Sequence, residues 1–313
     1  MIVNCQSQRE PPFVSQRTRN LAGSHHSGTL PAEVEEVFQL LAIGIVVSNL
    51  PRMSKQQSLN QPLACDSPLF VDFEKRYNLL HPSERDSFFV DLVQDVIRSQ
   101  LGPRRVVDIG CGRGIGTSAD LFARLRPDCD ELIGVEPDKS VEPAAGVFTA
   151  FHRSTFEECE IPDGSVDVAF SCMVMEHVTD PAAFMARLYR ALRPGGQYIF
   201  MTVNGAHYFA IISNALRRLG LDEQVLRLVR GRQSVDSYHY PTAYRFNDPA
   251  CISQVCRSCG FDEPRFVFAE HPGAKCYFPG PTKAVWHAMT LKRKVIRKPE
   301  LLLELIGLVT KPA

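Results

Sequence analysis

A glycine-rich turn after an apolar segment is the first place where this sequence could bind a ligand. Residues 106–117 read VVDIGCGRGIGT, in which Asp108 precedes four glycines at alternate positions: Gly110, Gly112, Gly114 and Gly116. Glycine weakens regular elements, and its usual role is a left-handed backbone or the close approach of a ligand to the chain. The spacing therefore predicts a tight turn that lies against a bound molecule.

The spacing of the glycines and one acidic residue narrow the class of ligand. A dinucleotide-binding turn requires G-x-G-x-x-G, and Ile115 occupies the place of the third glycine. A Walker phosphate loop also fails, because no Gly-Lys-Ser/Thr follows. Glu136 ends the next apolar segment, where an acidic side chain can accept hydrogen bonds from both ribose hydroxyls. The sequence therefore favours a nucleoside without a pyrophosphate.

Strand and helix patterns alternate around this turn. Apolar segments of strand length occur at 104–110, 131–136, 149–153, 165–171, 197–203, 264–270 and 302–310. Helical patterns occur at 67–100, 117–126, 139–148, 180–193 and 248–260. The last of these helices is expected to be capped by Asn247. The alternation predicts an α/β fold in which helices cover both faces of a parallel sheet.

Charge and cysteine content give no support for a nucleic-acid partner or a metal. Lys plus Arg equals Asp plus Glu, at 35 each, so no net field draws the chain onto nucleic acid. The ten cysteines form no regular framework, which predicts reduced thiols and a cytoplasmic location. Cys256 and Cys259 have zinc-ligand spacing, but without a second pair we favour a helix end stopped by Gly260.

Residues 1–60 are rich in Ser, Gln, Asn, Arg and Pro and show no sustained period, which is typical of a weakly ordered tail. The apolar run 37–50 is shorter than the ~20 residues of a membrane-spanning helix. We expect a chain that begins at Met53 to fold, the alternative being that the run 37–50 is buried against the domain.

Four segments in order resemble the class I S-adenosylmethionine-dependent methyltransferases: VVDIGCGRG, LIGVEPD, IPDGSVDVAFSCMVMEHV and LRPGGQYIFMTVN. The resemblance covers roughly residues 75–311. It implies S-adenosyl-L-methionine as the cofactor and a doubly wound, mostly parallel, seven-stranded Rossmann-like sheet with a reversed last hairpin. We divide the chain into the tail, 1–60, and a methyltransferase domain, 61–313, with a lid or acceptor insertion at 204–246.

The resemblance also implies which residues hold the cofactor. They are Asp108, Gly110, Gly112, Gly114, Glu136, Pro137, Thr155, Phe156, Ser171 and Cys172. Asp108 and the glycines would surround the methionine part, Glu136 would bind the ribose, and Pro137 would lie beside the adenine. Thr155 and Phe156 fall at the adenine edge, where many relatives have an aspartate in place of Thr155. Ser171 and Cys172, just past the fourth strand, would lie under the sulfonium.

Glu176 and His177, in the segment MEHV, would lie on the acceptor side of the pocket. A hydroxyl acceptor loses its proton as the new bond forms, and an imidazole titrates near neutral pH, so His177 is the candidate base. The alternative is that His177 only packs against the loop. Ubiquinone-pathway and small-RNA 2′-O-methyltransferases have a similar Glu-x-x-Glu-His that can hold a divalent metal, but Met173 replaces the first glutamate here, which disfavours a metal.

The sequence therefore predicts transfer of a methyl group to a small molecule, at a hydroxyl of a saccharide, a lipid-linked acceptor or an aromatic metabolite. Methylation of nitrogen or carbon, and a cofactor-binding module without turnover, remain the alternatives. Tyrosines and histidines of 204–246 would line the acceptor site or pack the insertion against the domain. Basic segments at 215–232 and 291–298 allow a weak peripheral contact with a membrane, the alternative being a solvated helix face.

Overall fold

The computed structural model describes residues 67–81, 83–115, 119–143, 145–207, 210–211, 243–270, 287, 290–291 and 294–313. The predicted tail, 1–60, and most of the insertion, 204–246, lie outside these residues. The predictions for Gly116 and for the basic segment 215–232 also fall outside them. The described residues include the glycine turn from Gly110 to Ile115 and the strands on either side of it.

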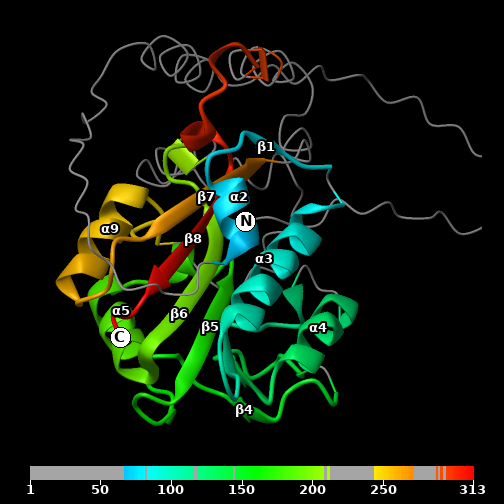
Figure 1. Cartoon of the computed structure of the whole chain (residues 1–313), viewed down its shortest axis with the longest axis vertical. Helices are drawn as coiled ribbons and strands as arrows, with labels where there is room; N and C mark the ends of the chain where they lie inside the picture. The colour runs from blue at the N-terminus through cyan, green and yellow to red at the C-terminus, as the bar shows by residue number, and fades with distance from the viewer. Residues whose placement is uncertain are drawn as a thin grey trace, which may run out of the picture. The chain divides into compact units, whose positions relative to one another are not determined.

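A mixed sheet forms the centre of this fold (Figure 1). Within the described residues its eight strands lie in the order β1-β7-β8-β6-β5-β2-β3-β4. They are β1 (Asn78–Leu79), β2 (Arg105–Ile109), β3 (Glu131–Val135), β4 (Ala150–His152), β5 (Val166–Cys172), β6 (Leu192–Val203), β7 (Arg265–Glu270) and β8 (Glu304–Thr310). Neighbours are parallel except that β8 runs antiparallel to β6 and β7.

This topology confirms the mostly parallel α/β fold and its reversed last hairpin. The expected seven strands become eight because the two-residue strand β1 pairs with the outer edge of β7. The direction in which successive strands are added to the sheet reverses between β2 and β5. These two strands are adjacent in the sheet, although β3 and β4 lie between them in the chain. In open α/β sheets ligands bind at such a reversal, outside the carboxyl ends of the strands.

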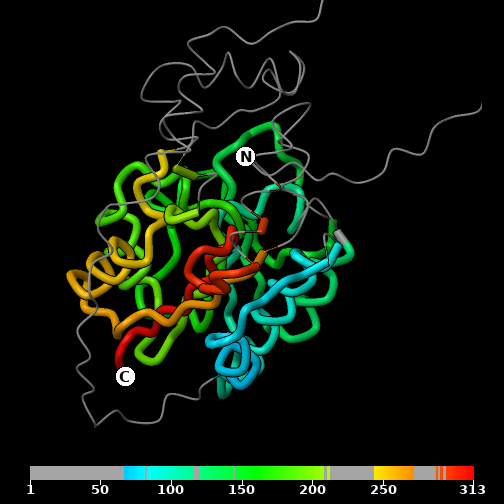
Figure 2. Tube along the Cα trace, turned by 90° about the horizontal axis from the view of Figure 1, so that it is seen from above, coloured from blue at the N-terminus to red at the C-terminus, as the bar shows by residue number. Residues whose placement is uncertain are grey.

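Helices cover both faces of the sheet, as Figures 1 and 2 show. The α-helices whose bounds the structure gives are α2 (Pro68–Glu74), α3 (Arg85–Ser99), α4 (Ala119–Leu125), α5 (Pro181–Ala191) and α9 (Pro249–Ser258). Short 3₁₀ turns are η2 (Arg126–Asp128), η3 (Met175–His177) and η6 (Pro299–Leu301). Apolar side chains of α3 and α4 pack in one cluster, and those of α5 and α9 pack in another.

The central strands supply both apolar layers because successive side chains of a strand point to opposite faces. On β5, Phe170 belongs to the cluster with α3 and α4, whereas Ala169 belongs to the cluster with α5 and α9. Both residues are almost completely buried. The sheet is therefore covered on both faces, and its strand ends are the places where a ligand can reach the backbone.

One helix and one helix cap predicted from the sequence are wrong. Residues 139–148 do not form a helix in their described part but a series of turns, because Pro143 and Gly146, which has φ +73°, interrupt the helical hydrogen bonds. The cap of α9 is Asp248, whose carboxylate accepts the N–H groups of Ala250 and Cys251, both at 3.0 Å. Asn247 instead donates its amide to the carbonyl of Val203, at 3.1 Å.

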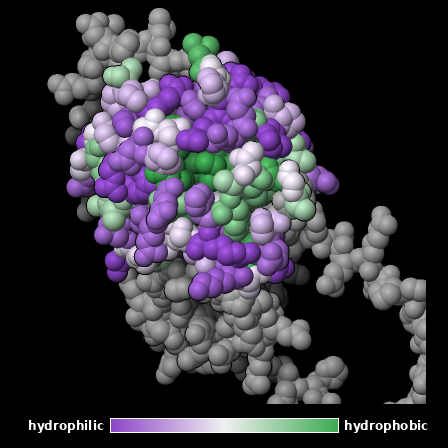
Figure 3. All heavy atoms as spheres, turned by 90° about the horizontal axis from the view of Figure 1, so that it is seen from below, coloured by the Kyte–Doolittle hydropathy of each residue, from purple (hydrophilic) through white to green (hydrophobic). Residues whose placement is uncertain are grey.

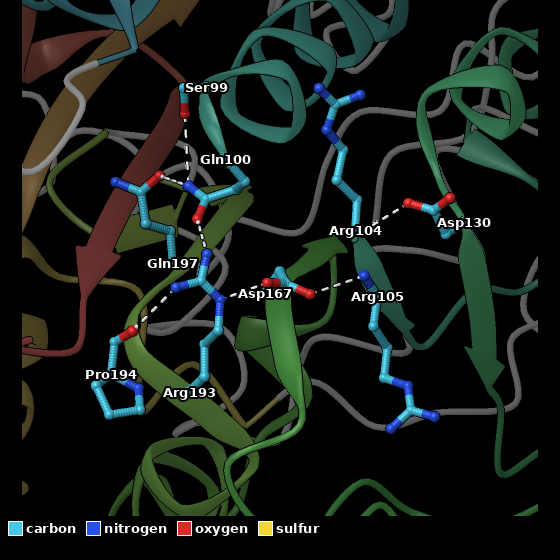
Figure 4. Close-up of polar contacts among 9 residues, drawn as sticks. All are labelled: Ser99, Gln100, Arg104, Arg105, Asp130, Asp167, Arg193, Pro194 and Gln197. Carbon is cyan, nitrogen blue, oxygen red and sulfur yellow. Dashed lines mark hydrogen bonds and ion pairs between the residues drawn. The ribbon is translucent and has the colours of Figure 1, made fainter. Parts of the chain in front are cut away.

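A polar network joins the strands at the edge of the sheet where the parallel strands begin (Figure 4). The carboxylate of Asp167 accepts the Nε–H of Arg193 and, at 2.8 Å, the backbone N–H of Arg105. Arg193 also donates to Gln100, at 3.0 Å, and Gln100 donates to Gln197, at 2.7 Å. The network ties β2, β5 and β6 to the end of α3.

Seen from below, the coloured surface of the molecule is largely hydrophilic around an apolar centre (Figure 3).

Candidate functional site

The glycine turn leaves β2 with a backbone that favours glycine. Gly110, Gly112 and Gly114 have φ values of 66°, 52° and 120°, in the region that other residues rarely adopt. The N–H groups of Gly110 and Cys111 donate to the carbonyl of Val135, at 2.8 and 3.2 Å, which holds the turn against the end of β3. The alternation of glycines in the sequence thus corresponds to a repeated left-handed backbone.

The first two glycines differ in what surrounds them. A Cβ on Gly110 would lie 2.5 Å from Cγ2 of Val174, so this position has no room for a side chain. A Cβ on Gly112 would meet no atom within 4 Å. Gly110 therefore permits the close packing of the turn against the segment that follows β5, whereas Gly112 leaves open space beside the backbone, as a bound molecule requires.

Glu136 spans the turn from the end of β3. It is 5% exposed, and its Oε2 accepts the backbone N–H of Gly112, at 2.9 Å. Its Oε1 accepts the N–H of Asp138, also at 2.9 Å. These bonds fix the carboxylate beside the open space at Gly112, where the sequence predicts ribose hydroxyls. The neighbouring Pro137, predicted to lie beside the adenine, is exposed.

Asp108 is a buried carboxyl group, one oxygen of which makes no hydrogen bond among the described residues. It lies on β2 and is 2% exposed, and its Oδ2 has no hydrogen-bond partner among the described residues. Burial raises the pKa of Asp108 well above its ordinary value, and the charge of Glu136 raises it further. An acidic group that is kept in such surroundings is typical of a functional site. It suits a ligand that brings a positive charge or a hydrogen-bond donor.

A family model described as a methyltransferase domain matches residues 82–243, more than half of the chain. The chain belongs to the class I S-adenosylmethionine-dependent methyltransferases. The cofactor of this methyltransferase is S-adenosyl-L-methionine, as the sequence predicts. The site residues fit it, because the cofactor has a ribose for Glu136, a positive charge that suits Asp108, and no pyrophosphate.

Proteins of known name match parts of this methyltransferase. A stretch of 147 residues is 34% identical to a ubiquinone biosynthesis O-methyltransferase of Sodalis glossinidius, covering 44% of this chain and 55% of that protein. A stretch of 119 residues is 33% identical to a probable S-adenosylmethionine-dependent methyltransferase of Mycolicibacterium smegmatis, covering 36% of this chain and 44% of that protein. The chain thus spans about half the length of these relatives. The YcgJ protein of Bacillus subtilis superposes with a TM-score of 0.45 at 16% identity, over 72% of this chain and 99% of that one.

Two predicted cofactor residues have side chains that the fold uses in other contacts. Ser171 and Cys172 are the last two residues of β5 rather than residues beyond it. The hydroxyl of Ser171 is fully buried and lies 2.6 Å from the hydroxyl of Tyr198. Burial raises the pKa of the Cys172 thiol well above its ordinary value; Arg85 lowers it, and Glu176 and Asp108 raise it again. Cys172 is thus a neutral thiol whose pKa is affected by the charges of both Asp108 and Glu176.

The predicted adenine residues lie in the loop between β4 and β5. Thr155 is exposed. The ring of Phe156 is buried against Phe184 of α5, with ring centroids 5.6 Å apart. The backbone N–H of Phe156 donates to no residue in the described part of the chain. Phe156 therefore offers a ligand its backbone rather than its ring.

Glu176 and His177 lie in the 3₁₀ turn η3, which begins shortly after the end of β5. Glu176 is fully buried; its Oε2 accepts the hydroxyl of Thr202 on β6, at 2.7 Å, and its Oε1 has no hydrogen-bond partner in the described part of the chain. Its backbone carbonyl accepts the N–H groups of Ala243 and Tyr244, at 2.7 and 2.9 Å. His177 is half-buried. The turn is thus fixed to β6 and to the end of the 204–246 insertion.

The described residues contain no group of three or more His, Cys, Asp or Glu side chains arranged to hold a metal ion. Met173, which occupies the place of a metal-ligating glutamate in some relatives, has φ +58° where the chain leaves β5. Cys259 caps the C-terminus of α9 and Gly260 follows it with φ +90°, as predicted for a helix end. Among the described helices, none is long and apolar enough to span a bilayer.

The structure adds two polar residues that the sequence analysis missed. Thr202 binds Glu176 across 26 positions of sequence. Arg85, at the start of α3, is 7% exposed, forms an ion pair with Asp86 at 2.6 Å and lies 3.9 Å from Glu304. Thr202 lies in the segment LRPGGQYIFMTVN without a role that the sequence marks, and Arg85 lies in none of the four segments. Strand pairing and the packing of α3 bring these side chains to the carboxyl edge of the sheet.

Proposed function

We propose that this methyltransferase transfers a methyl group from S-adenosyl-L-methionine to a hydroxyl oxygen of a small molecule in the cytoplasm. The observation that carries the proposal is the η3 turn, which presents a buried carboxylate next to a histidine at the switch point of the sheet. Val174, just before this turn, lies against Gly110 of the cofactor turn. A base beside the cofactor is what a hydroxyl acceptor requires and what a preformed nucleophile does not.

When it is bound, S-adenosyl-L-methionine supplies an electrophilic methyl group on a sulfonium, and S-adenosylhomocysteine leaves as the acceptor oxygen binds the methyl carbon. His177 takes the proton of the acceptor hydroxyl. Glu176, held by Thr202, accepts a hydrogen bond from a second donor of the acceptor at Oε1 and so orients it. Alignment of the acceptor with the methyl carbon is the larger contribution, because in-line transfer depends chiefly on geometry.

The first relative reported above is named for O-methylation in ubiquinone biosynthesis, which supports oxygen as the acceptor atom without identifying the acceptor of this chain. A saccharide, a lipid-linked acceptor and an aromatic metabolite all carry hydroxyl groups that could satisfy Glu176 and His177. The rival proposals are methylation of a nitrogen or carbon atom, for which His177 is less necessary, and a module that binds the cofactor without turnover.

The test is transfer of label. The protein is incubated with methyl-labelled S-adenosyl-L-methionine and fractionated cell metabolites, and each labelled product is identified by mass spectrometry. The proposal expects label on a hydroxyl oxygen of a small molecule. Label on nitrogen or carbon would overturn the choice of oxygen. No labelled product in any fraction, from protein that binds S-adenosylhomocysteine, would favour the binding module.

A further inference from the structure

The loop between β4 and β5 has few backbone hydrogen bonds of its own. Cys159 donates to the carbonyl of Phe156, at 3.3 Å, and Ile161 donates to that of Cys159, at 3.0 Å. These short-range bonds shape the middle of the loop, and only its end is attached to α5 by backbone bonds, from the N–H groups of Gly164 and Ser165 to the carbonyls of Arg190 and Ala191, at 2.7 and 3.0 Å. Before Gly164, side-chain contacts with a neighbouring element hold the loop in place.

That element is α5, through Arg187. This arginine is only 6% exposed, and its Nη2 donates to the carbonyl oxygens of Cys159 and Ile161, at 2.8 and 2.7 Å. Its Nη1 lies 3.6 Å from a carboxylate oxygen of Asp163. The guanidinium carbon lies 5.5 Å from the centroid of the Phe156 ring. One side chain thus contacts the loop at four successive places.

A guanidinium is suited to this role. Its planar, permanently charged group presents several N–H donors in fixed directions and stacks on aromatic rings. A lysine at the same position would bring a single ammonium without a planar face, and an apolar side chain would leave two buried carbonyls without their donor. The segment around Cys159 and Ile161 therefore depends on arginine at position 187 for its attachment to α5.

We infer that Arg187 is a positioning residue for recognition of the adenine ring. This inference rests on the proposed cofactor site, in which Thr155 and Phe156 lie at the adenine edge. Arg187 does not contact the ligand but holds the backbone of the loop where the N–H of Phe156, which has no partner in the described part of the chain, can meet the base. The inference deepens the proposed cofactor site by naming the residue that positions the loop at the adenine.

The test compares Arg187→Met with Arg190→Met, the same change at an exposed arginine of the same helix. Calorimetric titration well below the melting temperature uses S-adenosylhomocysteine and S-inosylhomocysteine, in which a carbonyl oxygen replaces the adenine amine. We expect Arg187→Met to weaken S-adenosylhomocysteine binding by at least ~10-fold, which corresponds to about 1.4 kcal/mol. Binding of the inosine analogue should fall much less, so that selectivity is lost, and Arg190→Met should change neither.

Arg187→Lys is the second variant, for use if Arg187→Met does not fold. It should retain part of the affinity for S-adenosylhomocysteine and part of the selectivity between the two ligands. A lower melting temperature with wild-type affinity and selectivity would show that Arg187 only stabilises the fold, and would overturn the inference. Equal weakening of both ligands would also overturn it. Failure of the wild-type chain to bind S-adenosylhomocysteine would instead overturn the cofactor assignment itself, which separates the two failures.

Discussion

Replacing Asp108 with asparagine should stabilise the protein, and more so as the pH rises. Burial and the charge of Glu136 raise the pKa of Asp108, and its Oδ2 has no hydrogen-bond partner among the described residues. Such a group binds its proton more tightly in the folded than in the unfolded state. It therefore costs no stability below its unfolded pKa, and an increasing amount as the pH rises through its folded pKa. An amide does not titrate, so Asp108→Asn removes this cost.

The size of the gain follows from the same observations. Each unit by which the pKa is raised corresponds to about 1.4 kcal/mol at pH values above the folded pKa. The amide is itself a buried polar group and retains part of a desolvation cost of about 1–3 kcal/mol. We expect a net gain of at least ~1 kcal/mol at about pH 8, which raises the melting temperature of a domain of this size by about 2–4 °C.

Thermal unfolding of the wild type, Asp108→Asn and Asp167→Asn, at about pH 8 and about pH 4.5, tests this reasoning. Asp167 is also buried, but its carboxylate binds Arg193 and the N–H of Arg105, so its replacement should lower the melting temperature (Figure 4). A loss of stability in Asp108→Asn at the higher pH, or a gain that does not shrink at the lower pH, would refute the account. The gain should come with weaker binding of S-adenosylhomocysteine, because the proposed cofactor site loses a carboxylate.

Three further outcomes are expected. Gly110→Ala should lose about 1–2 kcal/mol of stability from its left-handed backbone alone and more from its clash with Val174. In urea unfolding Gly112→Ala should lose less stability than Gly110→Ala, but it should lose more affinity for S-adenosylhomocysteine. Equal losses of stability would contradict the finding that, of the two, only Gly112 has room for a side chain. His177→Ala should lower kcat by ~10²–10⁴ with cofactor affinity unchanged, and normal turnover would leave His177 a packing residue. Thr202→Val should lower kcat/KM for the acceptor while Thr202→Ser retains it, and equal activity of the two would show that the bond to Glu176 has no catalytic role.

Much of the fold could be predicted because its elements have local signatures. The strands predicted at 104–110, 131–136, 165–171 and 264–270 correspond within a few residues to β2, β3, β5 and β7. Runs of buried β-branched residues bounded by turn residues are typical of buried strands. The helix expected at 139–148 failed because Pro143 and Gly146 outweigh the propensity of the residues between them. The strand β1 has two residues, too few for any periodicity to show in the sequence.

The candidate site was predictable in part for the same reason. Asp108, the glycines and Glu136 lie in two short segments whose geometry follows from the strand ends, and the structure brings these segments together by the bond from Gly112 to Glu136. The contacts of Thr202 with Glu176, and of Arg187 with the β4–β5 loop, are different. They join residues 26 to 28 positions apart through strand pairing and helix packing, and no local pattern marks them.

Calorimetric titration of S-adenosylhomocysteine tests the central claim most directly, namely that the glycine turn and Glu136 form the cofactor site. The wild type and Glu131→Ala, which alters a carboxylate at the opposite end of β3, should bind alike. Glu136→Ala should bind more weakly by ~1.5–3 kcal/mol, or about 10- to 150-fold, because charge-assisted hydrogen bonds are lost. Unchanged affinity in Glu136→Ala would remove this residue from the site, and tight binding of NAD in place of S-adenosylhomocysteine would contradict the account.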